Sequence, residues 1–167
     1  PASGLELHTI FAATGQTGAF LVASGRMNPP QAAAPVFVLG SDEVMRLQSV
    51  VSNTGALPYP ELYAGTDGPN GPVLVGASGA VVRVAGAGWE RNRGNDQPTG
   101  DLHGITAGVI IQPNHASFRY FAVGAGGAIW HSGGGGPTGW VRIPSPTTRD
   151  LFGIAFGRGQ WVRAGQE

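Results

Sequence analysis

The chain has 167 residues, with ten Arg, no Lys and ten acidic residues, so its formal net charge is zero. This neutrality leaves no basic field for nucleic acid and no basic amphipathic segment for a membrane surface, and no apolar run reaches the ~18 residues that a membrane span needs. Hydrophobic residues reach 41% and occur in short runs, which argues against disorder despite 29 Gly and 13 Pro, and the lack of Cys excludes disulfides and thiolate metal sites.

A five-residue pattern recurs four times along the chain and predicts repeated units. Each copy begins with an acid, a Leu, an aromatic residue or His, and a small residue, at 6–10, 61–65, 101–105 and 150–154. The repeat leucines are 55, 40 and 49 positions apart, and such a period is typical of repeated supersecondary units. They are Leu7, Leu62, Leu102 and Leu151.

The segments that follow each copy predict four short strands per unit, which we name A to D in chain order. Strand A holds the repeat Leu, and strand B is a second apolar run, at 20–23, 73–76, 120–124 and 161–165. Strand C follows as Gly-Ala-[IV] at 79–83 and 127–132, and strand D as W-x-R at 89–91 and 140–143. In the first unit we expect strand D within 44–51. Gly and Pro clusters separate the strands, and because no window combines helical periodicity with caps, we expect almost no helix.

Four-stranded units of this length predict an all-β fold made of β-propeller blades. We expect a single domain over residues 1–167, with blades over about 5–57, 61–98 and 101–146 and the first two strands of a fourth blade over 150–167. An open stack of this kind would expose strand edges, which native proteins avoid. We therefore expect a partial propeller that is completed by the rest of a longer chain, by a second fragment or by another copy.

Several repeated residues are interpreted as structural rather than functional. Trp89 and Trp140, like the repeat leucines, recur at fixed places and are expected to supply buried area between units. The residue after each repeat Leu is interpreted in the same way, since a metal site would need His in every copy, and Tyr63 and Phe152 break that pattern. The acids before strand A are expected to accept backbone N–H bonds in the connecting turns. They are Glu6, Glu61, Asp101 and Asp150.

These motifs resemble a known family of propellers. The pattern L-x-[GT]-I … VG-x-x-G-x-[IV]-x-x-S … GW-x-R is similar to that of the BNR/Asp-box propellers, most of all the photosystem II stability and assembly-factor type and its bacterial relatives. The resemblance is clear over 61–167 and weak over 1–60. Residues 132–140 keep the Ser, Gly, Thr and Trp of an Asp-box, with Gly134 where the Asp belongs. Arg83 holds the place of an Arg that is common after strand C in this type, and His131 replaces it in the next unit.

The resemblance implies a non-enzymatic scaffold that binds a protein partner. The alternative is a carbohydrate-binding module, or a fragment of a sialidase-like or xyloglucanase-like propeller, which the Trp and Arg residues beside Gly-rich loops favour. Trp130 is the first binding candidate because it aligns with Val82 and so is not a required core position, and exposed aromatics are typical binding anchors. The full set of binding candidates is Trp130, His131, Arg83, Arg119 and Trp161.

No catalytic pattern stands out. The acids show no glycosidase pairing, and Arg91, Arg93, Arg119 and Arg142 show no convergent spacing. Four His residues are present without a G-x-S-x-G elbow. We therefore lean towards no enzymatic activity, predict no cofactor and no metal, and favour a secreted or periplasmic location. Unit-specific function is expected in the two longest inserts, 27–35 and 111–117.

Overall fold

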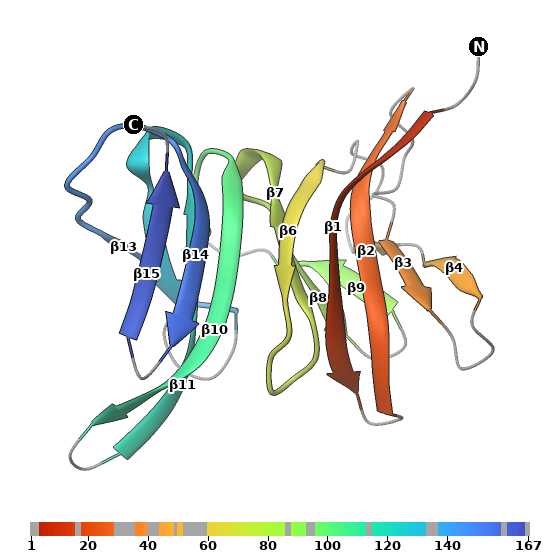
Figure 1. The fold of residues 1–167 in the computed structure, drawn as a ribbon, viewed down its shortest axis with the longest axis horizontal. Coiled ribbons are helices and arrows are strands. Elements are labelled where there is room, and N and C mark those ends of the chain that lie inside the picture. The colour runs from red at the N-terminus through yellow and green to blue at the C-terminus, as the bar shows by residue number, and fades with distance from the viewer. Residues whose placement is uncertain are drawn as a thin grey trace.

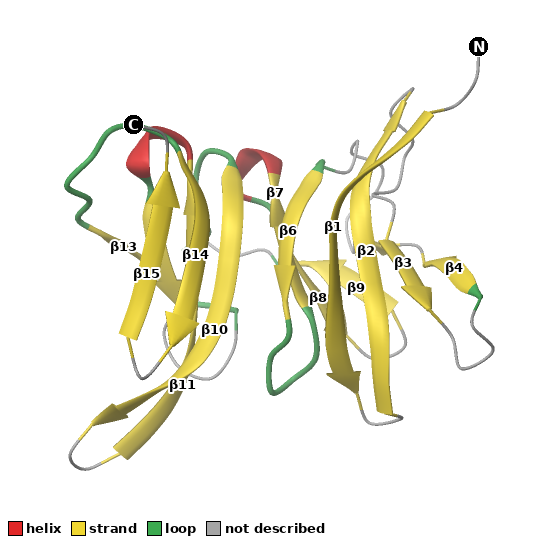
Figure 2. Ribbon diagram, viewed as in Figure 1, coloured by secondary structure: helices red, strands yellow, loops and turns green. Residues whose placement is uncertain are grey.

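The computed structural model describes residues 4–15, 18–28, 36–39, 44–48, 50–51, 60–85, 88–92, 96–112, 115–132, 137–157 and 160–165. Most of them lie in β-strands, so the prediction of an all-β chain is confirmed (Figures 1 and 2). The only helical elements in these ranges are two three-residue 3-10 turns, η1 (Ala77–Gly79) and η2 (Ala125–Gly127). Across the same residues, no helix is long and apolar enough to cross a membrane.

The strands form consecutive sheets that follow the predicted units. The first and third units are four-stranded antiparallel sheets in chain order, β1-β2-β3-β4 and β10-β11-β12-β13, and the last is a two-stranded sheet, β14-β15. The second unit has the same order, β6 to β9, with one extra strand at its outer edge. The bounds of the first unit are β1 (Gly4–Gly15), β2 (Gly18–Asn28), β3 (Val36–Leu39) and β4 (Met45–Gln48).

The remaining strands lie over the runs that the sequence predicted as A to D. Those of the second unit are β6 (Leu62–Thr66), β7 (Val73–Gly76), β8 (Val81–Ala85) and β9 (Gly88–Arg91). Those of the third and fourth are β10 (Leu102–Gln112), β11 (His115–Gly124), β12 (Ile129–Ser132), β13 (Trp140–Ile143), β14 (Leu151–Gly157) and β15 (Gln160–Gly165).

Two segments differ from the sequence prediction. The extra strand, β5 (Val50–Val51), follows β4 but pairs in parallel with β9 of the second unit, which no pattern predicted. In the segment 111–117, expected as an insert, residues 111–112 end β10 and residues 115–117 begin β11, and the two strands are paired up to Gln112 and His115. In the other expected insert, Met27 and Asn28 end β2, and residues 29–35 lie outside the described part.

The four A strands lie side by side and form one wall of the molecule, in the order β1, β6, β10, β14 (Figure 1). The sheets extend behind this wall, and a hydrophobic core fills each space between consecutive units. Leu62 packs with Val22 and Val36 of the first unit, and Leu102 packs with residues of β7 and β8, so these two repeat leucines are buried against the preceding sheet. Leu7, in the first unit, is 53% exposed.

The repeat acids link consecutive units. The Oδ1 atom of Asp101 accepts the N–H of Ser78 at 2.9 Å, and Oδ1 of Asp150 accepts that of Gly126 at 2.8 Å. The prediction that these acids accept backbone N–H bonds is therefore confirmed for two of them, but the turn belongs to the preceding unit. The main-chain oxygen of Asp101 also accepts the N–H of Ala125 in its own unit at 2.9 Å, so one residue connects two turns.

Strand B ends in Gly because its backbone lies against the carbonyl oxygen of the repeat acid at the start of strand A. A Cβ atom at Gly124 would lie 1.9 Å from the carbonyl oxygen of Asp101, and one at Gly76 would lie 1.8 Å from that of Glu61. No side chain fits at this separation, because the two backbones are already in contact. The repeated V-G motif thus reflects the close approach of strand B to the start of strand A.

Candidate functional site

Four aromatic rings form a continuous row along the wall of A strands. They belong to the residue that follows each repeat Leu: His8, Tyr63, His103 and Phe152. The ring centroids of successive members are 5.5, 5.6 and 5.0 Å apart. The first and last pairs are stacked, with interplanar angles of 24° and 26°, and the middle pair is tilted by 41°. We call these four residues the ring row.

Each member of the ring row sits at a β-bulge. The antiparallel pairing of strands A and B shifts by one residue between Leu7 and Thr9, and at the equivalent place in the other three units. A bulge leaves one residue unpaired and re-aims its side chain. Because the A strands lie next to each other, four bulges at equivalent positions bring the four rings together.

The members of the ring row pack against one another across consecutive units, as their interpretation as packing residues implies, but they lie outside the hydrophobic cores of the described residues. None of its members belongs to the core clusters of the described residues. Phe152 is 47% exposed, and the side chain of His8 is 20% exposed. The rings cover one another's faces, so the surface they offer consists mainly of ring edges and the outer face of Phe152.

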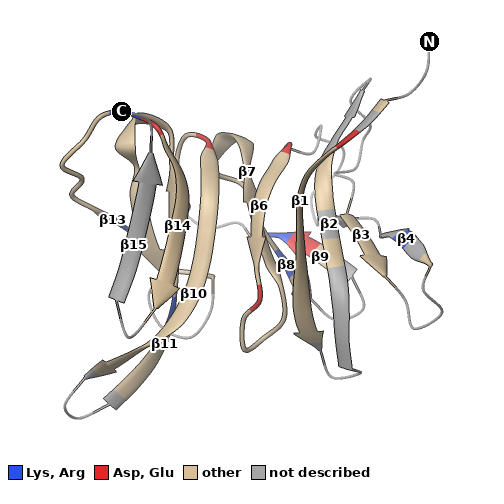
Figure 3. Ribbon diagram, in the orientation of Figure 1, with Lys and Arg blue, Asp and Glu red and all other residues tan. Residues whose placement is uncertain are grey.

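Carboxylates run beside the ring row. The four repeat acids lie at the same end of the wall, at the starts of strands β1, β6, β10 and β14 (Figure 3). The hydroxyl of Tyr63 donates to Oε2 of Glu61 at 3.1 Å, and Nε2 of His8 lies 3.5 Å from Oε1 of Glu6. The side chain of Glu6 is 68% exposed. The wall therefore presents aromatic edges with negative charge along one side.

Of the predicted binding residues, Arg119 and His131 come together. The Nη1 atom of Arg119 lies 3.0 Å from Nδ1 of His131, and the ring of Phe121 is 6.2 Å from the His131 ring. The Nδ1 atom of His131 also lies 3.1 Å from the main-chain oxygen of Ser132; since a guanidinium only donates and a carbonyl oxygen only accepts, the tautomer of the ring decides which of the two contacts is a hydrogen bond. The pair lies on neighbouring strands β11 and β12 rather than on the wall of A strands.

The other predicted residues lie elsewhere. Trp130 is partly buried and packs against the core between the second and third units, and its Nε1 is buried without a hydrogen-bond partner among the described residues. Arg83 pairs with Glu90, whose Oε1 is 2.7 Å from Nη2. Trp161 lies in β15, but its side chain is outside the described part. Trp89 and Trp140 are buried, at 2% and 4% exposure.

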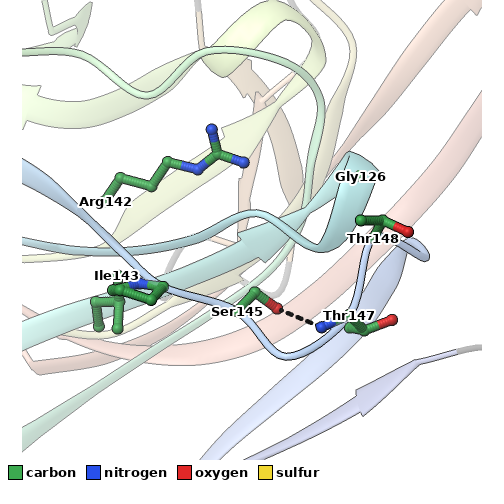
Figure 4. A pocket seen from close by; sticks show the side chains of 7 residues that line it. Gly126, Arg142, Ile143, Ser145, Thr147 and Thr148 are labelled. Atoms are coloured by element: carbon green, nitrogen blue, oxygen red, sulfur yellow. Dashed lines mark hydrogen bonds between the residues drawn. The ribbon is translucent and has the colours of Figure 1, made fainter.

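An open depression lies on the third unit, between strand β13 and the loop that leads to β14 (Figure 4). Its volume is about 370 Å³, and one guanidinium and three hydroxyl groups line it. The lining residues are Gly126, Arg142, Ile143, Pro144, Ser145, Thr147 and Thr148. Sequence analysis missed this site because its hydroxyl residues fall in a plain Ser/Thr/Pro linker between two strands.

A polar contact joins the first two units where they meet the third, through the exposed Thr14 and the half-buried Asp67. Thr14 donates to Oδ2 of Asp67 through its backbone N–H at 2.9 Å and its hydroxyl at 2.5 Å. The Oδ1 atom of Asp67 and the hydroxyl of Tyr120 are buried without hydrogen-bond partners among the described residues. Burial, together with the charge of Asp67, raises the pKa of Tyr120 from 10.0 to about 12. Nothing in the described residues groups three or more His, Cys, Asp or Glu side chains around a possible metal ion.

Comparison of the chain with protein-family models, with curated proteins and with solved structures found no match. The fold class therefore rests on the strands and their pairing, and the function has to be argued from the surfaces described above.

Proposed function

We propose that the chain is part of a β-propeller scaffold that binds a protein partner and has no enzymatic activity of its own. The arrangement supports this because successive sheets follow the order A-B-C-D and their A strands share one wall, as blades do around a propeller axis. The observation that carries the binding proposal is the ring row, a partly exposed aromatic surface that crosses all four units.

The chemistry of the ring row favours a cationic protein segment as its partner. Aromatic residues are enriched at protein interfaces and dominate their binding energy. The edges of the rings and the outer face of Phe152 offer apolar contact, and Glu6 at the other end offers an exposed carboxylate. An extended segment that carries an apolar residue at one end and Arg or Lys several residues away would satisfy both features.

Sugar stacking on the ring row is disfavoured by the same geometry. A carbohydrate ring packs against the open face of an aromatic residue, whereas the faces of Tyr63 and His103 are covered by their neighbours. The carbohydrate-binding alternative is favoured by a different observation, the hydroxyl-lined depression beside Arg142. A glycan array tests this second candidate directly.

Selection of random 12-residue peptides displayed on phage tests the proposed function. We expect the chain to select peptides that carry an aromatic or aliphatic residue and, several residues away, Arg or Lys. Their affinity should fall about tenfold for Phe152→Ala, the loss of one interface anchor, and stay unchanged for Val141→Ala, a control on the outer strand that is 52% exposed. Selection of no binders, or of binders that ignore Phe152, would contradict the proposal.

A further inference from the structure

We propose that the depression beside Arg142 binds an anionic group: a carboxylate, a phosphate or a sulfate. This site is separate from the ring row and does not depend on the protein-binding proposal. Three features of the depression indicate an anion: Arg142 differs in its contacts from the equivalent Arg91, several hydrogen-bond donors line the site, and no carboxylate lines it.

Arg142 and Arg91 occupy the same place in the W-x-R segments of neighbouring units. Only Arg91 donates a hydrogen bond to the turn between strands B and C of its unit. The Nη2 atom of Arg91 donates to the carbonyl oxygen of Ser78 at 3.4 Å. Gly126 is the equivalent of Ser78 in the third unit, since the backbone N–H of each donates to the carboxylate of the following repeat acid. Arg142 is exposed, and no hydrogen bond or ion pair joins it to any residue that the structure describes. Its five N–H donors are therefore free to meet a ligand.

Two hydroxyl groups of the depression are also set up to donate. The Oγ atom of Ser145 accepts the backbone N–H of Thr147 at 3.4 Å, and Oγ1 of Thr147 accepts that of Arg149 at 3.1 Å. Each oxygen thus uses a lone pair on the backbone, and the O–H proton is left for another acceptor. The guanidinium of Arg142 and these two O–H groups can all donate to an anion.

The charge around the depression agrees with this assignment. No carboxylate lines it, although Asp150 lies close by, since its Oδ1 accepts the N–H of Gly126 at 2.8 Å. Arg149 directly precedes Asp150 in the chain, so this pair of residues adds no net charge beside the depression. A volume of about 370 Å³ admits a single acidic group with a small substituent, such as a sugar acid or a chain-terminal carboxylate.

Titration by two-dimensional amide NMR tests the proposal. The probes are sodium sulfate, sodium phosphate and sodium glucuronate at constant ionic strength, with sodium chloride as the reference. We expect saturable shifts of the Gly126, Thr147 and Thr148 amides with at least one probe, at a Kd on the order of millimolar because the site is open to solvent. The probe that binds most tightly distinguishes a carboxylate from a tetrahedral oxyanion as the preferred group.

Two variants separate this site from general charge effects. Arg142→Gln should weaken binding about tenfold or more by removing the guanidinium, while Arg91→Gln, which changes the net charge equally, should leave it within about twofold, a difference under 0.5 kcal/mol. The amide spectrum of each variant shows whether it is folded. Shifts that do not saturate with any of the three probes, or saturable shifts that persist in Arg142→Gln, would overturn the proposal.

Discussion

His103 stacks on Phe152 with ring centroids 5.0 Å apart, although the two residues belong to different sheets. This contact joins consecutive units outside the hydrophobic cores. We predict that Phe152→Ala lowers the free energy of unfolding by about 0.5–1.5 kcal/mol, the range of an aromatic pair beyond its buried area. Urea denaturation measures this change, and a double-mutant cycle with His103→Ala should recover a coupling of the same size. A coupling near zero would show that the rings do not interact.

The existence of the repeat could be predicted from the sequence, but the ring row could not. Leu and Trp recur at buried positions, and the V-G motif recurs where two backbones are in close contact. Residue type alone therefore identifies these positions. Residue type does not identify the β-bulges in this chain. The four bulge positions share no single residue type, since they hold His8, Tyr63, His103 and Phe152. Their meeting depends on the pairing shift within each hairpin and on the side-by-side placement of the A strands.

The burial of a repeated residue also depends on the sheet that lies next to it, which its residue type does not reveal. Leu7 and Leu62 occupy equivalent places, yet Leu62 is fully buried and Leu7 is 53% exposed, because burial requires a sheet on the preceding side. Trp130 was chosen for binding because Val82 stands in its place in the second unit, but Val82 is itself fully buried, and Trp130 packs against a core. A difference in residue type between equivalent positions of two units therefore does not show that the position is exposed to solvent.

Tyr120→Phe should stabilise the protein. The hydroxyl of Tyr120 is buried without a partner among the described residues, and an unsatisfied buried hydroxyl costs about 1–3 kcal/mol. Removing it should raise the free energy of unfolding by about 1 kcal/mol in urea denaturation, since Phe keeps the ring packing. A loss of stability instead would mean that the hydroxyl makes a hydrogen bond that stabilises the fold.

The same residue predicts a pH dependence at alkaline pH. The pKa of Tyr120 is about 12 in the folded protein and 10.0 as the ordinary value, so the folded state holds the proton more tightly. Below pH 10 both states are protonated and stability does not change through this group. Between pH 10 and 12 the unfolded chain loses the proton first, and stability should fall by up to about 3 kcal/mol. The chain has no Lys to titrate in this window.

Tyr120→Phe is also the control for this effect. Urea denaturation of both proteins between pH 9 and 12 measures the free energy of unfolding at each pH. This free energy should fall less steeply with pH in the variant, by the contribution of one ionising group. Equal slopes for the two proteins would rule out Tyr120 as the source.

Because Asp101 links two units, we expect substitutions of the repeat acids to have unequal effects on stability. Asp101→Ala removes the acceptor of the Ser78 N–H and should cost about 1 kcal/mol of stability, since this charge-assisted bond is partly exposed. Glu6→Ala is the matched control, because its side chain is 68% exposed, and should change stability by less than about 0.5 kcal/mol. Thermal unfolding ranks the two variants, and equal effects would contradict the linking role.

Gly124→Ala should be severely destabilising. Its Cβ would lie 1.9 Å from the carbonyl oxygen of Asp101, so the strand pairing at the start of the third unit must shift. We expect a loss of about 3 kcal/mol or more, the range of backbone strain and overpacking. Gly157→Ala, with no atom within 4 Å of its Cβ, should change stability little. Circular dichroism melting curves of both variants test the comparison, and a tolerated Gly124→Ala would refute the close contact.

The binding role of the ring row is tested most directly by mapping a selected peptide onto the protein with NMR. The largest shifts and the intermolecular contacts should fall on the ring protons of Tyr63, His103 and Phe152, and Phe152→Ala should remove them. Shifts that gather on the outer strands, or that are unchanged in Phe152→Ala, would contradict the account and place the binding surface elsewhere on the units.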